Sequence, residues 1–180
     1  MDTETPLRQR QIMLRRALTL LGGVGLLAGL VAISSAQATT ATNTFTVQAI
    51  INSACNVSAT TLNFGNYDPT SATALNGTST VNVYCTSGTP YTTSLNIGTG
   101  GGSFVTRTIA SGGNTLNYNL YRDSARSQVW GDGTGATFTV AGTGTGLLTA
   151  SPLTVYGQIA SGQDKPPGTY TSVITVTVTY

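Results

Sequence analysis

The stretch TYTSVITVTVTY, Thr169 to Tyr180, has the most regular hydrophobic pattern in this chain of 180 residues. Its apolar side chains alternate with threonines, and they are Ile174, Val176, Val178 and Tyr180. Strict alternation predicts a β-strand that buries one face and exposes the other. A regular edge of this kind is also a template for pairing with another polypeptide.

A second strongly patterned segment, TNTFTVQAIINSAC, spans Thr42 to Cys55. The side opposite its polar residues is apolar and consists of Phe45, Val47, Ala49 and Ile51. Period-2 alternation again predicts a strand. The pattern by itself leaves open whether this strand joins its own sheet or that of a neighbouring molecule.

The chain between these two segments contains short alternating runs separated by turn-forming residues. They predict strands within 56–68, 79–86, 91–98, 103–110, 114–123, 136–140 and 153–160. We expect SGTP (87–90) to join two strands within hairpin length, and GGN (112–114) to supply positive φ angles. No run beyond the N-terminal segment has the spacing of an amphipathic helix. The prediction is an all-β, Ig-like antiparallel sandwich.

The N-terminal segment has the organisation of a secretory signal peptide. Arginines precede an uncharged run at 17–33, and small residues follow it up to Ala36-Gln37-Ala38. This order predicts a signal peptide over residues 1–38 with cleavage after Ala38. The alternative is an uncleaved membrane anchor, because 17 apolar residues lie at the lower limit for spanning a bilayer.

Beyond residue 38 the chain is electrically neutral, with four basic and four acidic side chains. They are Arg107, Arg122, Arg126, Lys165, Asp68, Asp123, Asp132 and Asp164. A neutral surface has no electrostatic footprint for nucleic acid and no basic patch for anionic lipid. It also does little to oppose self-association.

The same residues offer little for catalysis, since they include no histidine and no glutamate. A Ser-His-Asp relay is therefore excluded, and glycosidase chemistry needs two convergent carboxylates. The aspartates lie in contexts such as YDPT and GDGT, where we expect Asx-turn roles. We expect Arg122, Asp123 and Arg126 to form a small surface ion network. The prediction is a protein that is not an enzyme, with no catalytic residue, metal or cofactor.

Cys55 and Cys85 are the only cysteines. In an exported protein they most simply form one disulfide, and two free buried thiols are the alternative. Aromatic residues leave two interpretations open, a carbohydrate-binding surface or the core of a sandwich. They are Tyr67, Tyr84, Tyr91, Tyr118, Tyr121, Tyr156 and Trp130.

Five separated motifs, in order, resemble the spore coat protein U domain, which is also the major-subunit domain of archaic chaperone–usher pili. They are CNVSATTLNFGNYD (55–68), VNVYCTSGTPYTTSLN (81–96), LNYNLYRDSARSQVWGDG (116–133), LTVYGQIASGQ (153–163) and PGTYTSVITVTVTY (167–180). The most distinctive parts are FG-Y at 64–67 and YNLYRDSAR at 118–126. The resemblance covers essentially all of residues 43–180.

The resemblance implies an incomplete Ig-like sandwich at 53–180, preceded by a donor-strand extension at 39–52. On this view Phe45, Val47, Ala49 and Ile51 enter the groove of a neighbouring subunit. The edge of that groove, which a periplasmic chaperone would occupy first, is formed by Ile174, Val176, Val178 and Tyr180. Such strand addition is a form of β-augmentation.

The function implied is that of a structural pilus subunit, exported through the periplasm to the cell surface and supporting adhesion and biofilm formation. Its implied partners are related pilin subunits, the chaperone and an outer-membrane usher. Two alternatives are a spore- or cell-coat protein that assembles without a pilus, and a monomeric carbohydrate-binding module.

Overall fold

The computed structural model describes residues 37–180. The predicted signal peptide lies almost wholly outside these residues and stays a prediction. The chain divides into two units, Met1–Val47 and Gln48–Tyr180. Residues 37–54 form neither helix nor strand, and the side chains of residues 37–53 are exposed. Within the described range there is no helix of the length and hydropathy that a bilayer crossing requires.

The second unit contains eight strands and, among its described residues, no helix. The strands are β1 (Cys55–Ala59), β2 (Leu75–Cys85), β3 (Pro90–Leu95), β4 (Arg107–Ser111), β5 (Asn114–Tyr121), β6 (Val140–Thr143), β7 (Ser151–Ile159) and β8 (Val176–Thr179). Alternating burial along β2, β3 and β7 agrees with the predicted pattern. The expected all-β class is confirmed.

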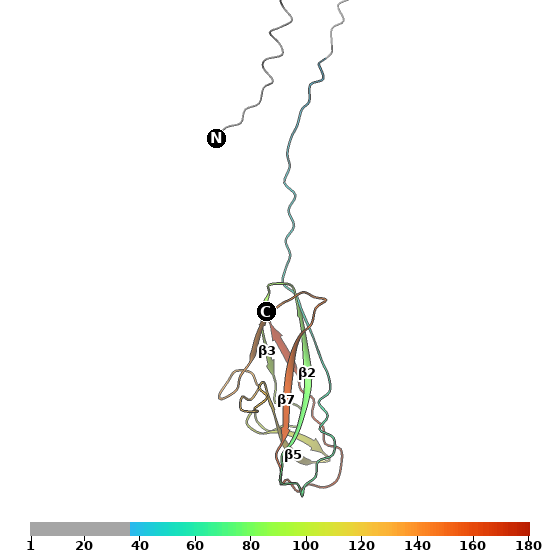
Figure 1. Cartoon of the computed structure of the whole chain (residues 1–180), viewed down its shortest axis with the longest axis vertical. Coiled ribbons are helices and arrows are strands. Elements are labelled where there is room, and N and C mark those ends of the chain that lie inside the picture. Colours follow the sequence, from blue (N-terminus) through green and yellow to red (C-terminus); the bar gives the residue numbers. More distant parts are fainter. Residues whose placement is uncertain (1–36) are drawn as a thin grey trace, which may run out of the picture. The chain divides into compact units, whose positions relative to one another are not determined.

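The strands form two antiparallel sheets. Sheet A has the order β1-β2-β7-β5-β4, and sheet B has the order β6-β3-β8. The long strands β2 and β7 lie side by side in the centre of sheet A (Figure 1). This arrangement confirms the predicted Ig-like sandwich. In the described part of the chain, β1 and β4 are the edge strands of sheet A, and β6 and β8 are those of sheet B.

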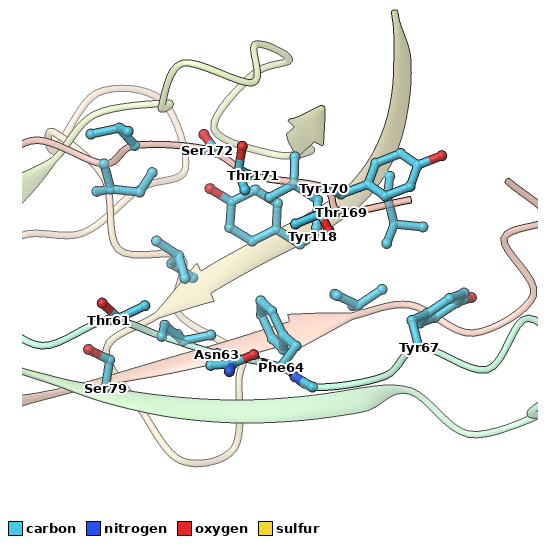
Figure 2. Close-up of a pocket in the computed structure, with 18 of the residues that line it drawn as sticks. Thr61, Asn63, Phe64, Tyr67, Ser79, Tyr118, Thr169, Tyr170, Thr171 and Ser172 are labelled. Atoms are coloured by element: carbon cyan, nitrogen blue, oxygen red, sulfur yellow. Dashed lines mark hydrogen bonds between the residues drawn. The ribbon is translucent and has the colours of Figure 1, made fainter. Parts of the chain in front are cut away.

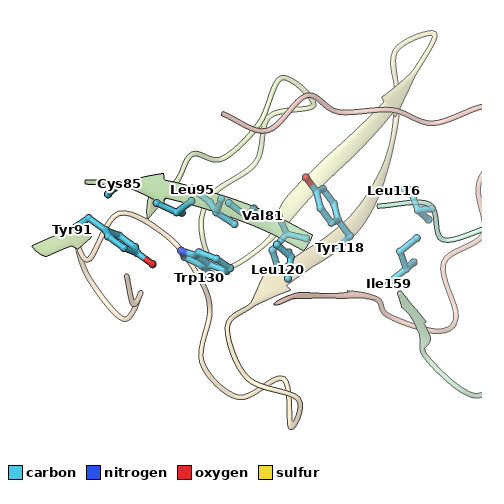
Figure 3. Packing of buried hydrophobic residues seen from close by; sticks show 11 residues of the cluster. Val81, Cys85, Tyr91, Leu95, Leu116, Tyr118, Leu120, Trp130 and Ile159 are labelled. Carbon is cyan, nitrogen blue, oxygen red and sulfur yellow. The ribbon is translucent and has the colours of Figure 1, made fainter. Parts of the chain in front are cut away.

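The core lies between the two sheets and surrounds Trp130, which is 1% exposed. Leu95 and Leu120 lie near its ring (Figure 3). The indole N–H donates to the carbonyl oxygen of Thr93 at 3.1 Å. Trp130 therefore has no accessible face for a sugar ring, which removes the aromatic residue most suited to the carbohydrate-binding alternative.

The disulfide joins Cys55 of β1 to Cys85 of β2, which are opposite each other in the strand register. The expected pairing is confirmed. It fastens the edge strand to the sheet at the point where the N-terminal segment leaves the sandwich, and the loop it closes spans 30 residues. Closing such a loop stabilises by about 3–4 kcal/mol in the loop-entropy account.

Some predicted boundaries are wrong. The predicted strand at 136–140 is displaced to β6, because the glycine-rich segment around it forms turns. The segment 87–90 links β2 in sheet A to β3 in sheet B, so it is a crossover between layers and not a hairpin. The predicted turn at Gly112 and Gly113 is correct, because both have positive φ between β4 and β5.

The strand predicted over 56–68 ends at Ala59, so residues 60–67 continue outside any strand, with the Thr60 N–H still bonded to the Thr80 carbonyl of β2. The final strand is also shorter than predicted. Residues 173 and 175 bond to the 96–99 segment partly through the Asn96 and Thr99 side chains, so regular pairing begins only at Val176.

Two glycines opposite each other in β2 and β7, Gly77 and Gly157, form a notch in sheet A. Leu62 and Phe64 occupy it. A Cβ atom added at Gly157 would lie 2.7 Å from Leu62 Cδ1 and 2.7 Å from Phe64 Cζ, while one at Gly77 would lie no closer than 3.2 Å to either side chain. The missing Cβ atoms therefore let the unpaired 60–67 segment lie against the sheet.

We predict that Gly157→Ala destabilises the protein by about 1–3 kcal/mol, because the new methyl group overpacks against Leu62 and Phe64. The matched variant Gly77→Ala should cost less, since its contacts are longer. Urea denaturation followed by circular dichroism measures both effects. Equal stability of Gly157→Ala and the unmodified protein would contradict the claim that Leu62 and Phe64 pack closely against Gly157.

Candidate functional site

A groove of about 920 Å³ opens in the sandwich between residues 59–67 and 165–176. Interiors of complete domains have few voids larger than a water molecule, which occupies about 30 Å³ of liquid. Figure 2 shows Thr61, Phe64 and Tyr67 along one side of the groove and residues 169–172 along the other. The groove is therefore an unfilled part of the sandwich and not a packing defect.

The floor of the groove is the hydrophobic core itself. Residues that are at most 6% exposed line it, and they are Val81, Leu95, Leu116, Tyr118, Leu120, Val155 and Ile159. These residues belong to strands of both sheets. An apolar segment inserted here would extend the core without displacing any strand.

One wall of the groove carries backbone groups available for hydrogen bonding. Asn96 N–H donates to the Thr175 carbonyl, and Thr99 N–H donates to the Val173 carbonyl, so residues 173 and 175 point toward sheet B. Backbone groups of successive residues in an antiparallel strand point to opposite sides. The N–H and C=O groups of Ile174, Val176 and Val178 therefore point away from β3, along the open edge.

The other wall is held in place without being part of a sheet. Leu62 and Phe64 are half-buried in the glycine notch. The Tyr67 hydroxyl donates to the Ala160 carbonyl at 3.0 Å and accepts from the Gln163 N–H at 2.8 Å. These contacts keep the wall apart from β8, so the groove remains open.

An aromatic pair lies within the groove. Phe64 points toward Tyr118 (Figure 2), with ring centroids 6.2 Å apart and an interplanar angle of 74°. Burial raises the pKa of the Tyr118 phenol above its ordinary value, and the Ser172 hydroxyl and the Arg107 cation oppose this shift. The folded protein therefore keeps the proton on Tyr118 more firmly than the unfolded chain does.

The sequence-predicted groove residues differ in position. Ile174 and Val176 line the groove, and Val178 is half-buried against the core beyond it. Tyr180 is 57% exposed and does not line the groove. The predicted donor residues are exposed, with Phe45 at 88% and Ile51 at 89%.

Sequence reasoning assigned no role to Leu62, Phe64 and Tyr170, which also line the groove. The alternation of LNF within 62–64 was the available signal, but it was interpreted as an ordinary strand. The alternative in which residues 44–51 are a strand of their own sheet does not occur, because residues 37–54 form no strand.

The polar residues singled out in the sequence are structural. Asp68 and Asp132 each accept from the N–H and the hydroxyl of a threonine two residues later, and these bonds lower their pKa values. Asp123 accepts from the Ser127 and Gln128 N–H groups. The bonds to the residue two positions later confirm the Asx-turn expectation for Asp68 and Asp132, whereas Asp123 binds N–H groups four and five residues later.

The expected ion network is wrong. Arg122 donates to the Gln128 side chain and the Thr139 carbonyl, and its guanidinium lies 4.5 Å from the Phe138 ring centroid. Arg126 donates to the Gly157 and Ser124 carbonyls. Both arginines therefore bind backbone oxygens and aromatic rings in place of Asp123, so this cluster stabilises the loop before β6.

The fold and the groove together define an antiparallel Ig-like domain with an open groove beside β8. Residues 41–177 match the model of the Spore Coat Protein U domain. The chain belongs to the Spore Coat Protein U domain family. It is 33% identical over 180 residues to Protein U of Myxococcus xanthus, covering 90% of this chain and 97% of that protein.

The chain is also similar to a solved structure, the CsuC–CsuE chaperone–tip adhesion subunit pre-assembly complex from archaic chaperone–usher Csu pili of Acinetobacter baumannii. The match has 25% sequence identity and a TM-score of 0.53, and it covers 72% of this chain. This chain spans only 40% of the length of the solved chain it matches.

We predict that the unassembled protein loses stability as the pH rises above about 10, because the raised pKa of Tyr118 makes ionisation less favourable in the folded state. The effect is absent below that pH. Tyr118→Phe should reduce the alkaline loss without abolishing it, since burial also raises the pKa of Tyr121. Urea midpoints measured between pH 8 and pH 11 test this, and an unchanged pH profile would contradict it.

Proposed function

We propose that this protein is a non-enzymatic structural subunit of a surface pilus, which polymerises when the N-terminal segment of one subunit fills the groove of the next. The observation that carries the proposal is the groove itself, which has a floor of core residues and a wall with outward-pointing backbone groups. A β-strand has the shape and the hydrogen-bonding groups that such a groove requires.

The two parts of the proposed contact have the same length. The donor side chains run from Phe45 to Ile51, which is seven residues. Thr171 exchanges backbone hydrogen bonds with Ala110, so by alternation Ser172 also points outward. The outward-pointing groups of the acceptor therefore run from Ser172 to Val178, again seven residues. At about 3.3 Å per residue both span roughly 20 Å. Four apolar donor side chains can therefore face inward while the backbone pairs along the whole open edge.

The ends of the sandwich determine the direction of the donated strand. The Ala54 N–H donates to the Thr86 side chain, and Thr92 pairs with Thr179. Ala54, where the N-terminal segment joins the sandwich, and the C-terminus therefore lie at the same end of the sandwich (Figure 1). A donor strand parallel to β8 would place both neighbouring subunits at this one end. An antiparallel strand gives each end one neighbour, so we infer antiparallel insertion.

The energetic gain has two parts. The backbone groups along the open edge of β8 exchange water for partners on the inserted strand, and each such hydrogen bond contributes about 0.5–1.5 kcal/mol net. The inserted side chains are also removed from water at about 25 cal/mol per Å² of apolar surface. Each contact joins the donor segment of one subunit to the groove of another, so it is a head-to-tail contact between two different surfaces. Repeated head-to-tail contacts that do not close into a ring build a filament.

The same groove accounts for the partners that the function requires. An unfilled groove exposes apolar surface and an open strand edge, which promote aggregation. A periplasmic chaperone that lends a strand, as in β-augmentation, would protect the subunit until an outer-membrane usher assembles it. The pilus subunit in the similar Csu complex is bound to a chaperone. Export to the cell surface, adhesion and biofilm formation belong to this proposal.

A second candidate function is assembly into a cell or spore coat without a pilus. The family description and the 33% identity to Protein U favour it. Strand donation serves both functions equally. Genes for a chaperone and an usher beside this gene would favour the pilus, and their absence would favour the coat.

We predict that Val47→Asp abolishes polymerisation, because it places a charge in the apolar groove, where an unpaired charge is strongly disfavoured. The matched control is Gln48→Asp, which adds the same charge on the opposite face of the donor segment. SDS-resistant ladders on gels of unboiled samples measure the polymer. Ladders of equal length from both variants would contradict the proposed orientation of the donor strand.

Deletion of residues 39–52 is a broader test. The shortened subunit should form no polymer but should still bind the chaperone, since its own groove is intact. A synthetic peptide with the sequence of residues 39–52 should bind to it one to one. SDS-resistant ladders from the deletion variant would show that another segment joins the subunits.

A further inference from the structure

Two leucines project from the sandwich at the end where the N-terminal segment leaves it. Leu148 is 99% exposed and Leu147 is 48% exposed, in the loop between β6 and β7. Exposed apolar groups that occur singly need no explanation, but two adjacent leucines on one loop form a small contact surface.

The loop has a defined position beside the disulfide. The Gly146 N–H donates to the carbonyl of Cys85 at 2.9 Å, and the Thr149 N–H donates to the Gly146 carbonyl at 3.2 Å. The Gly88 N–H donates to the Gly144 carbonyl at 2.9 Å. The leucines are therefore attached to the same end of the sandwich as Cys55, where the N-terminal segment begins.

A short connection limits how far apart two joined subunits can lie. Only Asn52, Ser53 and Ala54 separate the last donor side chain, Ile51, from Cys55. A fully extended chain covers at most about 3.6 Å per residue, so this connection spans no more than about 14 Å. Once Ile51 is in the acceptor groove, the leucine-bearing end of the donor must lie close to the end of that groove.

The end of the groove reached by Ile51 in antiparallel insertion has an apolar rim. Pro69, Pro166 and Pro167 line it and are exposed. Lys165 is the charged residue among the lining groups there. A rim of proline rings offers rigid apolar surface, which loses little conformational entropy on contact. Its chemistry is complementary to two exposed leucines.

We propose that Leu147 and Leu148 of each subunit pack against the rim of Pro69, Pro166 and Pro167 on the next subunit, as a second contact beside the donated strand. This proposal rests on strand donation and adds a surface that strand donation alone does not require. The contact restrains the angle between successive subunits, because the short connection and the leucine loop would then hold the acceptor at two points.

Cysteine cross-linking tests the contact in assembled polymer. In a Leu148→Cys/Pro167→Cys variant with the native disulfide intact, a short bismaleimide should join successive subunits and give ladders that survive boiling. The matched control, Ala125→Cys/Pro167→Cys, places the first cysteine on an exposed loop away from this end and should give no such ladder. In Leu148→Cys alone, modification by a maleimide should be lost when the subunit polymerises.

The outcomes separate this contact from strand donation. Normal SDS-resistant polymers in which the cysteine introduced by Leu148→Cys is never cross-linked, and is modified as fast as in the monomer, would overturn the leucine contact and leave strand donation intact. If Leu148→Cys blocks polymerisation while Ala125→Cys does not, and both monomers remain folded, the contact is supported. Failure of the unmodified protein to form any polymer would overturn both proposals.

Discussion

The open edge of β8 is the constraint on which the rest of the structure depends. The side chains of Val176 and Val178 in β8, and of Ile174 just before it, face the core, while the backbone groups of the same residues face away from β3. Among the described residues, β8 is paired with β3 on one side and has no strand on the other. The domain's own strands cover the side chains but leave these backbone groups to solvent, and the groove beside β8 has the space for another strand that would pair with them. The rest of the domain keeps that groove from collapsing, since the glycine notch draws Leu62 and Phe64 toward sheet A.

A buried arginine supports the sandwich beside β8. Arg107 on β4 is 0% exposed, and its guanidinium donates to the carbonyls of Asn96 and Trp130 and to the Asn119 side chain. Burial lowers its pKa. The Asn96 carbonyl accepts from Arg107, and the Asn96 side chain accepts from the Thr175 N–H. This single residue therefore connects both sheets beside β8 and fixes the position of the open edge.

Alternation along the chain was enough to predict the sandwich and the direction in which Ile174, Val176 and Val178 point, because a period of two determines which face of a strand is buried. The groove wall at 60–67 was not predictable, because an unpaired segment and a strand can have the same alternation. The burial of Arg107 could not be predicted from the local sequence pattern either. It depends on three acceptors from distant parts of the chain, which come together only in the folded protein. The boundaries of β6 and β8 moved for a related reason, as side-chain hydrogen bonds and glycine-rich turns replaced regular pairing there.

The most direct test of the account is residue-resolved hydrogen exchange of the mature protein before and after assembly. The amide of Thr175 bonds to Asn96 and should be protected in both states. The amides of Ile174, Val176 and Val178 should exchange rapidly in the monomer and slowly in the polymer. Slow exchange of these three amides in the monomer, or rapid exchange in the polymer, would contradict the claim that a second chain completes this sandwich.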